Sequence, residues 1–176
     1  MNGSSEKRMI DEYVSYRRNG VCRIADITTE DFGRQGRKQY YVLRSVYDKN
    51  VKVFVPIGSE LEKEMKSLPT KNEVMRFISE ASETEIEWSD DAKTRALYFD
   101  SIMAEGDRAK ILSLMLKLRA KRDRLEKLNK KLKANDAKFL AMTENLITGE
   151  FAFVLDIQRM EVIPFITERM AELDKD

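Results

Sequence analysis

The residue pattern changes at Pro56, and this change limits the folds that the chain can adopt. Before it, short runs of alternating apolar and polar residues, such as residues 51–55, are separated by turn residues such as Asn19-Gly20. After it, glycine and aromatic residues become scarcer, while Glu, Lys, Leu and Met recur at helical spacing. Strands followed by helices favour separate domains over an α/β sandwich. We therefore predict an α+β protein with two domains.

The N-terminal residues predict a small, curved antiparallel sheet or open barrel. Strands are predicted around Val14 and Tyr16, from Val21 to Ile27, over residues 40–43 and over residues 51–55. Turns are predicted at residues 34–38 and 48–50, and Pro56 ends the last strand. Four or five short strands within about 45 residues are typical of such a sheet. We expect a flexible N-terminus over residues 1–8, a first domain over 9–60 and a second over 61–176.

The C-terminal residues predict a bundle of helices. Thr70 and Glu73 form a capping-box pattern that opens the first helix. Ser89 is the expected N-cap of the second, after an acidic linker at residues 82–87. Pro164 is expected near the first turn of the last helix, where proline is tolerated. Helices are predicted over residues 71–81, from Ala92 to Gly106, from Asp107 onward, over 134–153 and over 161–173.

The composition excludes several kinds of active site. The chain has no His, so His-based triads and His metal sites are excluded. Cys22 is the only cysteine, and one thiol cannot build a zinc cage. The seven glycines form no phosphate-binding loop motif. We therefore expect no catalytic residue, no metal, no cofactor and no enzymatic activity.

The charge is unevenly distributed along the chain. The net charge is only +1, but residues 101–138 hold 12 Lys and Arg against 5 Asp and Glu. The segments on either side, residues 58–100 and 139–176, each carry a net −5. A basic block of this kind can bind an anionic surface even when the total charge is near zero.

The sequence predicts a cytoplasmic protein. No apolar run approaches the roughly 18–20 residues of a membrane helix, and the opening residues MNGSSEKR lack the apolar core of a secretory signal. A single cysteine allows no internal disulfide, which suits a reducing compartment. We expect no membrane partner and a monomer.

An ordered set of motifs between about residues 9 and 155 resembles the CarD family of bacterial transcription regulators. In the first half these motifs are Tyr16-x-x-Asn19-Gly20-Val21-Cys22-Arg23-Ile24-x-Asp26-Ile27, Gln39-Tyr40-Tyr41-Val42-Leu43-Arg44 and Val51-Lys52-Val53-Phe54-Val55-Pro56. In the helical half they are Trp88, Arg95, Gly106-Asp107, Leu132-Lys133-Ala134-x-Asp136-x-x-Phe139-Leu140 and Glu150-Phe151-Ala152.

This resemblance implies a function for each half. It implies a Tudor-like N-terminal domain, shared with transcription-repair coupling factors, that binds the β subunit of RNA polymerase. It implies that the helical half lies on promoter DNA at the upstream edge of the transcription bubble, largely independent of sequence. There a tryptophan wedges into the minor groove and stabilises the open complex. The coupling factors' motor motifs are absent, so the chain resembles the stand-alone regulator, associated with the nucleoid through polymerase.

Trp88 is the candidate wedge, and two interpretations of it are open. As a packing residue it would form a hydrophobic staple, but Ser89 as N-cap makes the staple partner Lys93, which is charged. As a wedge it would unstack bases in the minor groove. Lys93 and Arg95 are the nearest phosphate candidates, whereas Asp90 and Asp91 would repel phosphates. The other candidate DNA-binding residues are Lys121, Arg122, Lys130, Lys133 and Lys138.

The polymerase-binding candidates lie on two strands that could form an edge of the sheet, residues 51–55 and 27–32. An edge strand presents unpaired backbone groups to which a partner strand can add. If the valines of residues 51–55 face the core, Phe54 lies on the solvent side as an interface anchor; alternatively it fills a small core under a loop. The candidates are Ile27, Thr29, Glu30, Lys52, Val53 and Phe54.

Two other functions remain open. The chain could be a protein-interaction adaptor without DNA contact, in which case Trp88 would be buried. It could also be a module for RNA or single-stranded DNA, because small barrels often bind such ligands through basic and aromatic residues on one face. Residues that would form that face are Arg37, Lys38, Tyr40, Tyr41 and Tyr47.

Overall fold

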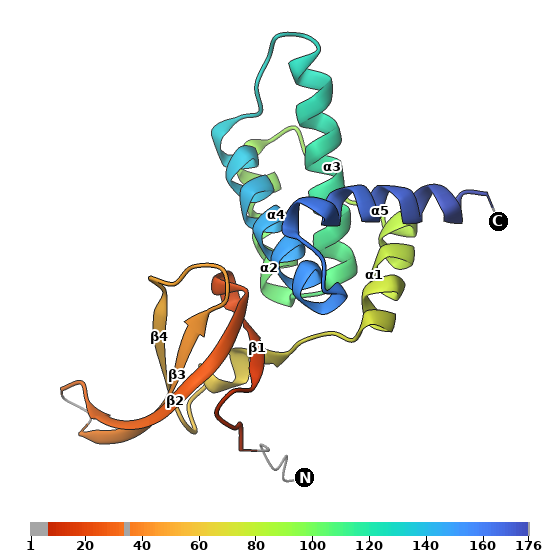
Figure 1. The fold of residues 1–176 in the computed structure, drawn as a ribbon. Helices are drawn as coiled ribbons and strands as arrows, with labels where there is room; N and C mark the ends of the chain where they lie inside the picture. Colours follow the sequence, from red (N-terminus) through yellow and green to blue (C-terminus); the bar gives the residue numbers. More distant parts are fainter. Residues whose placement is uncertain (1–6, 34–35, 176) are drawn as a thin grey trace, which may run out of the picture. The chain divides into compact units, whose positions relative to one another are not determined.

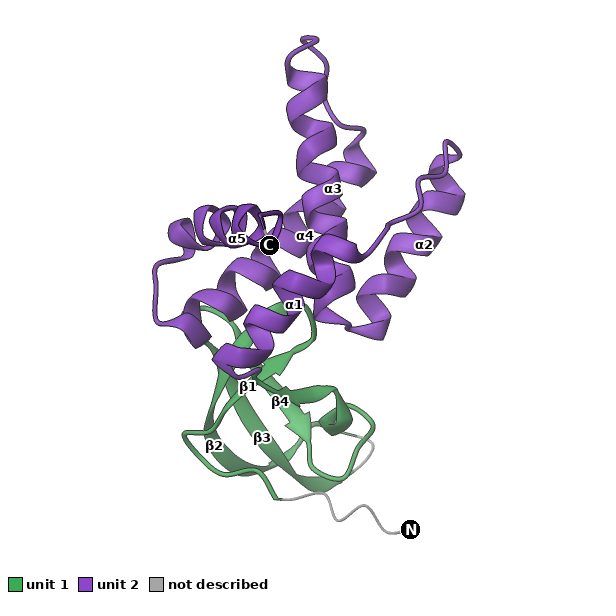
Figure 2. Cartoon of the chain, turned by 90° about the vertical axis from the view of Figure 1, so that its right-hand side faces the viewer, with its two compact units in different colours: residues 1–68 green, residues 69–176 purple. Residues whose placement is uncertain are grey.

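The protein is described here by a computed structural model that covers residues 7–33 and 36–175. It forms two compact units, a sheet unit over residues 1–68 and a helical unit over residues 69–176 (Figure 2). The α+β prediction is confirmed: an antiparallel sheet precedes five helices. The expected boundary at residue 60 falls earlier than the observed one at Leu68, because a short strand over residues 65–67 still pairs within the sheet.

The sheet unit contains five antiparallel strands in the order β4-β3-β2-β1-β5 (Figure 1). The strands are β1 (Tyr13–Tyr16), β2 (Val21–Asp31), β3 (Arg37–Ser45), β4 (Lys52–Pro56) and β5 (Met65–Ser67), with 3-10 turns η1 (Arg17–Asn19) and η2 (Glu62–Glu64). The β2–β3 register shifts between Ile24 and Asp26, and a bulge of this kind increases the local bend of a sheet. The turn predicted at residues 34–38 lies partly outside the described residues, and its last two residues belong to β3 instead, where they pair with β2.

The core of the sheet unit lies on one face of the sheet and follows the strand alternation. Tyr41 and Leu43 of β3 face it, together with Val55 of β4. Its other buried members are Val14, Tyr16, Cys22, Ile24 and Met65. Arg8 closes the N-terminal segment that the sequence predicts to be flexible, and its backbone N–H donates to the Tyr41 hydroxyl at 3.1 Å. Residues 1–6 of that segment lie outside the described residues.

The helical unit contains α1 (Lys71–Glu83), α2 (Ala92–Glu105), α3 (Arg108–Glu126), α4 (Ala134–Leu155) and α5 (Arg159–Leu173). Thr70 and Glu73 form the predicted capping box. Helix α3 is central: residues 111–115 are all buried, and α1, α2 and α4 pack around it (Figure 1). None of the helices in the described ranges is long and apolar enough to span a bilayer.

Two predicted helix starts were wrong. Asp91, not Ser89, caps α2, because its carboxylate accepts the Thr94 N–H at 2.7 Å. Helix α5 begins two residues earlier than expected, because Gln158 and Glu161 form a capping box. Pro164 therefore lies inside the helix rather than in its first turn.

Candidate functional site

Strand β4 forms one edge of the sheet. It pairs with β3 alone among the described strands, from Arg44↔Lys52 to Tyr40↔Pro56. Val53 and Val55 pack toward the core, which places Lys52 and Phe54 on the opposite, outer face. The backbone groups on the free side of β4 are therefore available to a further strand.

Phe54 belongs to an aromatic cluster on the outer face, formed with Phe32 and Tyr40. The ring centroids of Phe32 lie 5.1 Å from those of both Tyr40 and Phe54, in edge-to-face arrangements. Phe32 is 62% exposed, whereas Tyr40 beneath it is only 8% exposed. The Lys52 ammonium lies 4.7 Å from the Phe54 centroid. Phe54 thus combines both interpretations: it is on the solvent side, and it packs in a small cluster of its own.

The outer face also places two like charges opposite each other. Arg44 of β3 is the direct cross-strand neighbour of Lys52, and both residues are exposed. Like charges in this position disfavour strand pairing. Their repulsion would be relieved by a carboxylate brought by a partner.

The other predicted polymerase-binding residues lie at a different edge. Within the described ranges, β1 pairs with β2 only at residues 21–23, so the distal half of β2 has no strand on that side. Thr29 there is exposed, and the Glu30 carboxylate accepts the Thr28 hydroxyl at 3.0 Å. Ile27 packs against the core. The six candidates therefore divide between two edges, with β3 between them.

The tyrosines proposed for a nucleic-acid face do not share one. Tyr41 is fully buried in the core, while its neighbour Tyr40 belongs to the outer aromatic cluster. Tyr47 is exposed after the end of β3. Alternation along β3 thus separates residues that a stacking surface would need on one side.

In the helical unit, Trp88 is half-buried at the start of the segment that leads into α2. Its ring centroid lies 6.0 Å from that of Phe99, a core residue. Two cations lie against the indole: the Arg95 guanidinium carbon is 4.6 Å from the ring centroid, and the Lys121 ammonium is 4.0 Å from it. Trp88 is neither a core residue nor a free side chain.

Arg95 is only 3% exposed and is held by a salt bridge across the bundle. Its Nε and Nη2 donate to the two carboxylate oxygens of Asp136, at 3.0 and 2.9 Å. Its Nη1 donates to the Ser89 carbonyl at 2.6 Å. The expectation that Arg95 contacts phosphate does not fit this geometry, because all of these donors are engaged and the group is buried.

The same pair defines one end of the bundle. Arg95 lies in the first turn of α2 and Asp136 in the first turn of α4, while Lys121 lies near the end of α3. The connection between α3 and α4 extends beyond this end (Figure 1). The candidates Lys93, Lys130, Lys133 and Lys138 are all exposed, and none forms a salt bridge to a described residue.

Two features weaken the positive charge near Trp88. Arg122 is bound to Asp123, with Nη2–Oδ1 at 2.9 Å, and is near Glu126 and Glu144 as well. Asp91 is exposed, and the Thr94 N–H holds the pKa of its carboxyl below the ordinary value. It therefore stays charged within a few residues of the indole.

The comparison with protein families decides the identity of the sheet unit. Residues 9–65 match the model of the CarD-like/TRCF RID domain. They form a CarD-like RNA polymerase-interacting domain. This RID domain covers nearly the whole sheet unit, from just before β1 to the start of β5. No curated protein matches the chain.

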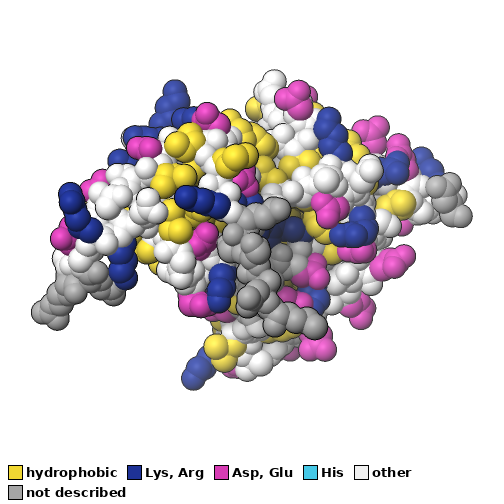
Figure 3. Space-filling model, turned by 90° about the horizontal axis from the view of Figure 1, so that it is seen from below, with side chains coloured by type: hydrophobic (Ala, Val, Ile, Leu, Met, Phe, Trp, Pro, Cys, Tyr) yellow, Lys and Arg dark blue, Asp and Glu magenta, His cyan; other side chains and the backbone are white. Residues whose placement is uncertain are grey.

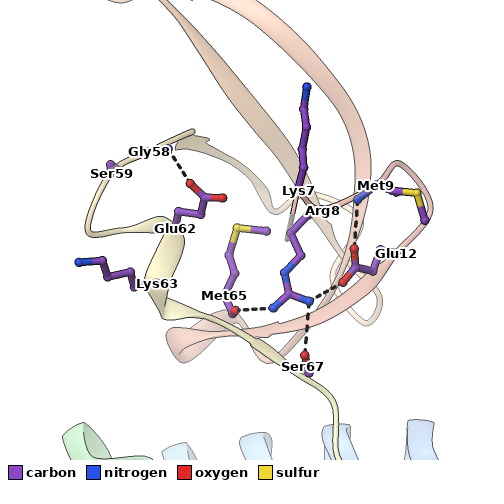
Figure 4. Close-up of a pocket in the computed structure, with 10 residues that line it drawn as sticks. All are labelled: Lys7, Arg8, Met9, Glu12, Gly58, Ser59, Glu62, Lys63, Met65 and Ser67. Atoms are coloured by element: carbon purple, nitrogen blue, oxygen red, sulfur yellow. Dashed lines mark hydrogen bonds and ion pairs between the residues drawn. The ribbon is translucent and has the colours of Figure 1, made fainter. Parts of the chain in front are cut away.

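A pocket of about 870 Å³ lies in the sheet unit between the N-terminal segment, η2 and β5 (Figure 4). Arg8 crosses it and donates to the Met65 carbonyl at 3.1 Å and the Ser67 hydroxyl at 3.3 Å. Arg8 also pairs with Glu12; burial raises the pKa of this carboxyl, but Arg8 and the Met9 N–H outweigh burial and lower it. Arg8 therefore links residues that themselves line the pocket, which indicates a structural role for this side chain.

Figure 3 shows one face of the molecule, on which acidic and basic side chains are interspersed with exposed hydrophobic ones. Charge alone therefore marks no interface on that face. The described residues also include no group of three His, Cys, Asp or Glu side chains that could hold a metal ion.

Asp136 and Phe99 are the site residues that sequence reasoning missed. Asp136 stands in the motif that carried the family resemblance, as does its partner Arg95, but the two are 41 residues apart. A salt bridge over that distance leaves no local pattern. Their joint presence among the family motifs was the one signal available.

Proposed function

We propose that this chain is a non-enzymatic bacterial transcription regulator that stabilises the open promoter complex. Its RID domain binds the β subunit of RNA polymerase, and its helical unit contacts promoter DNA at the upstream edge of the bubble. The observation that carries the proposal is the half-buried Trp88, with cations against its ring, at the end of the bundle where exposed lysines gather. The protein acts as a cytoplasmic monomer associated with the nucleoid through polymerase.

The polymerase contact is made by strand addition at β4. The free side of this strand supplies backbone donors and acceptors, and Phe54 offers an aromatic anchor beside them. The Arg44–Lys52 pair favours an acidic side chain on the added segment, because a carboxylate there would relieve their repulsion.

The DNA contact is made by the Trp88 indole and by lysines on the flanking backbone. Inserting an apolar wedge costs a few kcal/mol of base stacking, and this cost is lower where the bubble has already broken the stack. Lys93, Lys130, Lys133 and Lys138 contribute salt-dependent affinity through phosphates without reading sequence.

Polymerase binding makes a weak DNA contact effective. The RID domain raises the local concentration of the helical unit at the promoter. The open complex then gains stability only by the difference in affinity between open and closed DNA. A difference of about 1.4 kcal/mol changes the population tenfold.

The test measures open-complex lifetime with the cognate polymerase. Wild-type protein is expected to lengthen the lifetime, and Trp88→Ala to lose most of this effect while still binding polymerase. Lys52→Glu is expected to weaken polymerase binding. Its matched control is Lys66→Glu, which makes the same charge change on β5 at the opposite edge of the sheet. Equal lifetimes with wild-type and Trp88→Ala would refute the DNA contact.

One observation favours a second candidate, an adaptor without DNA contact. Trp88 packs on the core residue Phe99, as a structural tryptophan would. In that case Trp88→Ala would destabilise the helical unit without altering the lifetime of the open complex. The same experiment therefore separates the two functions.

A further inference from the structure

The segment from Thr84 to Trp88 lies along α3 and is bound to it at three successive points. The Ser113 hydroxyl donates to the Thr84 carbonyl at 2.6 Å. The Lys117 ammonium donates to the Ile86 carbonyl. The Lys121 ammonium lies 4.0 Å from the Trp88 ring centroid. Each contact thus joins one residue of the segment to one residue of the helix.

The spacing of these contacts matches on the two sides. On α3 they fall at every fourth residue, which is a rise of about 6 Å in an α-helix. On the segment they fall at every second residue, which is about 6.6 Å in an extended chain. Because the two repeats nearly coincide, an extended segment can run along the helix and meet all three side chains. Ile86, in the middle, is only 3% exposed.

The far end of the segment is bound as well. The Ser89 carbonyl accepts from Arg95, whose guanidinium is fixed by Asp136 and also lies against the indole. Trp88 therefore stands between two anchored neighbours, Ile86 and Ser89. Its backbone position is set on both sides, and its ring is in contact with two cations.

We propose that Ser113, Lys117 and Lys121 form a ladder that positions Trp88, with Lys121 as the positioning residue for the indole. This inference rests on the proposed role of Trp88 in binding DNA. It reassigns Lys121 from phosphate contact to positioning residue. An indole held in this way loses less conformational freedom on insertion, so the ladder raises the affinity for open DNA without touching the bases.

The test uses Trp88 as its own probe, since it is the only tryptophan. Lys121→Met keeps the aliphatic stem but removes the charge. We expect acrylamide quenching of Trp88 to rise about twofold or more and its emission to shift to the red. We expect the open-complex lifetime to fall to a value between those of wild-type and Trp88→Ala. Lys121→Arg keeps a cation against the ring, so its quenching and its open-complex lifetime are expected to stay near the wild-type values.

Two further variants make the result specific. Lys117→Met removes the middle contact and is expected to change quenching and lifetime in the same direction. Lys110→Met is the matched control. It makes the same substitution at the other end of α3, and it also removes a charged contact, the salt bridge from Lys110 to Glu105. It is expected to change neither property.

The outcomes distinguish this inference from the proposed function. If Lys121→Met shortens the lifetime while quenching stays at the wild-type value, Lys121 contacts DNA directly and the positioning role is overturned. If neither property changes, the ladder does not position the indole. If Trp88→Ala leaves the lifetime unchanged, the proposed function fails, whereas the quenching data still decide whether the ladder holds the ring.

Discussion

The two units are stabilised in different ways. The core of the sheet unit contains no charged side chain among its described residues, and the buried polar side chain in this unit is Ser15. The helical unit buries the Arg95–Asp136 pair, and it buries Glu150, which forms a salt bridge with the partly exposed Arg108. A sheet has its register fixed by alternation, since a shift of one residue would turn every side chain to the other face.

A helix that is buried on most sides has no such constraint. Residues 111–115 of α3 are consecutive and all buried, so apolar burial alone does not select one rotation of the helix. A bidentate salt bridge is directional and joins two particular positions. The difference between the units suggests that buried ion pairs specify the arrangement of the helices. In the sheet, the alternation of side chains along the strands already specifies the arrangement.

The chain contains one natural probe in each unit. Cys22 is fully buried in the sheet core, and Trp88 lies in the helical unit. Thiol labelling therefore reports on the first unit and tryptophan emission on the second. This makes the comparison directly measurable.

The largest effect is expected from Asp136→Ala. It leaves the Arg95 guanidinium buried without its counter-charge, a change that typically costs about 3–5 kcal/mol. The free energy of unfolding of the helical unit, measured in urea from Trp88 emission, is expected to fall by this amount. Labelling of Cys22 is expected to keep its wild-type rate.

The double variant Arg95→Met with Asp136→Leu is the control. Replacing both charges by apolar residues of similar volume is often close to neutral, so much of the lost stability is expected to return. A single variant with wild-type stability, or a double variant no better than the single, would contradict the role of the pair.

A smaller effect is expected from Leu43→Ala in the sheet core. Removing this fully buried side chain costs about 3 kcal/mol. Burial raises the pKa of the Cys22 thiol to about 11, so the native protein at pH 8 holds little of the thiolate that reacts with disulfide reagents. Labelling then requires opening of the unit, and the variant is expected to label about 100-fold faster.

The pH dependence gives an internal check on this prediction. Because folding raises the thiol pKa from 9.0 to about 11, the sheet unit is expected to lose stability as the pH rises through that range. Val14→Ala, in the same core, should speed the labelling of Cys22 as Leu43→Ala does, while Asp136→Ala should leave the labelling rate unchanged. Rapid labelling of the native wild-type protein at pH 8 would refute the burial of Cys22.

The sequence predicted the sheet unit more completely than the helical site. Strand alternation correctly indicated that Lys52 and Phe54 lie opposite Val53 and Val55. It could not show that Phe32, after the end of β2, packs on Phe54, because that contact depends on the β2–β3–β4 register.

In the helical unit, capping patterns located most helices within two residues, but the surroundings of Trp88 were not predictable from local pattern. Its neighbours Arg95, Phe99 and Lys121 come from two helices, and the charge of Arg95 suggested an exposed residue. Ser89 looked like the better N-cap until Asp91 proved to be nearer to the helix. The Arg95–Asp136 contact, which holds the segment around Trp88 in place through the Ser89 carbonyl, could not be predicted from the local sequence.

The smallest effect is expected from Thr70→Ala at the start of α1. It removes the hydroxyl that accepts the Glu73 N–H at 3.2 Å, and loss of such a cap costs about 1 kcal/mol. Only the unfolding transition followed by Trp88 emission is expected to shift, and Thr70→Ser should retain most of the cap.

The pH dependence of this cap follows from Glu73. Hydrogen bonds from the backbone and side chain of Thr70 lower the pKa of its carboxyl below 4.5, so the stability that Glu73 contributes is present above that pH and is lost as the pH falls. The difference between Thr70→Ala and wild-type is therefore expected to narrow in acid. A difference that stays constant from pH 7 to pH 3 would show that the Glu73 carboxylate gains no stability from the Thr70 hydroxyl, since its bond from the Thr70 backbone N–H is kept in the variant.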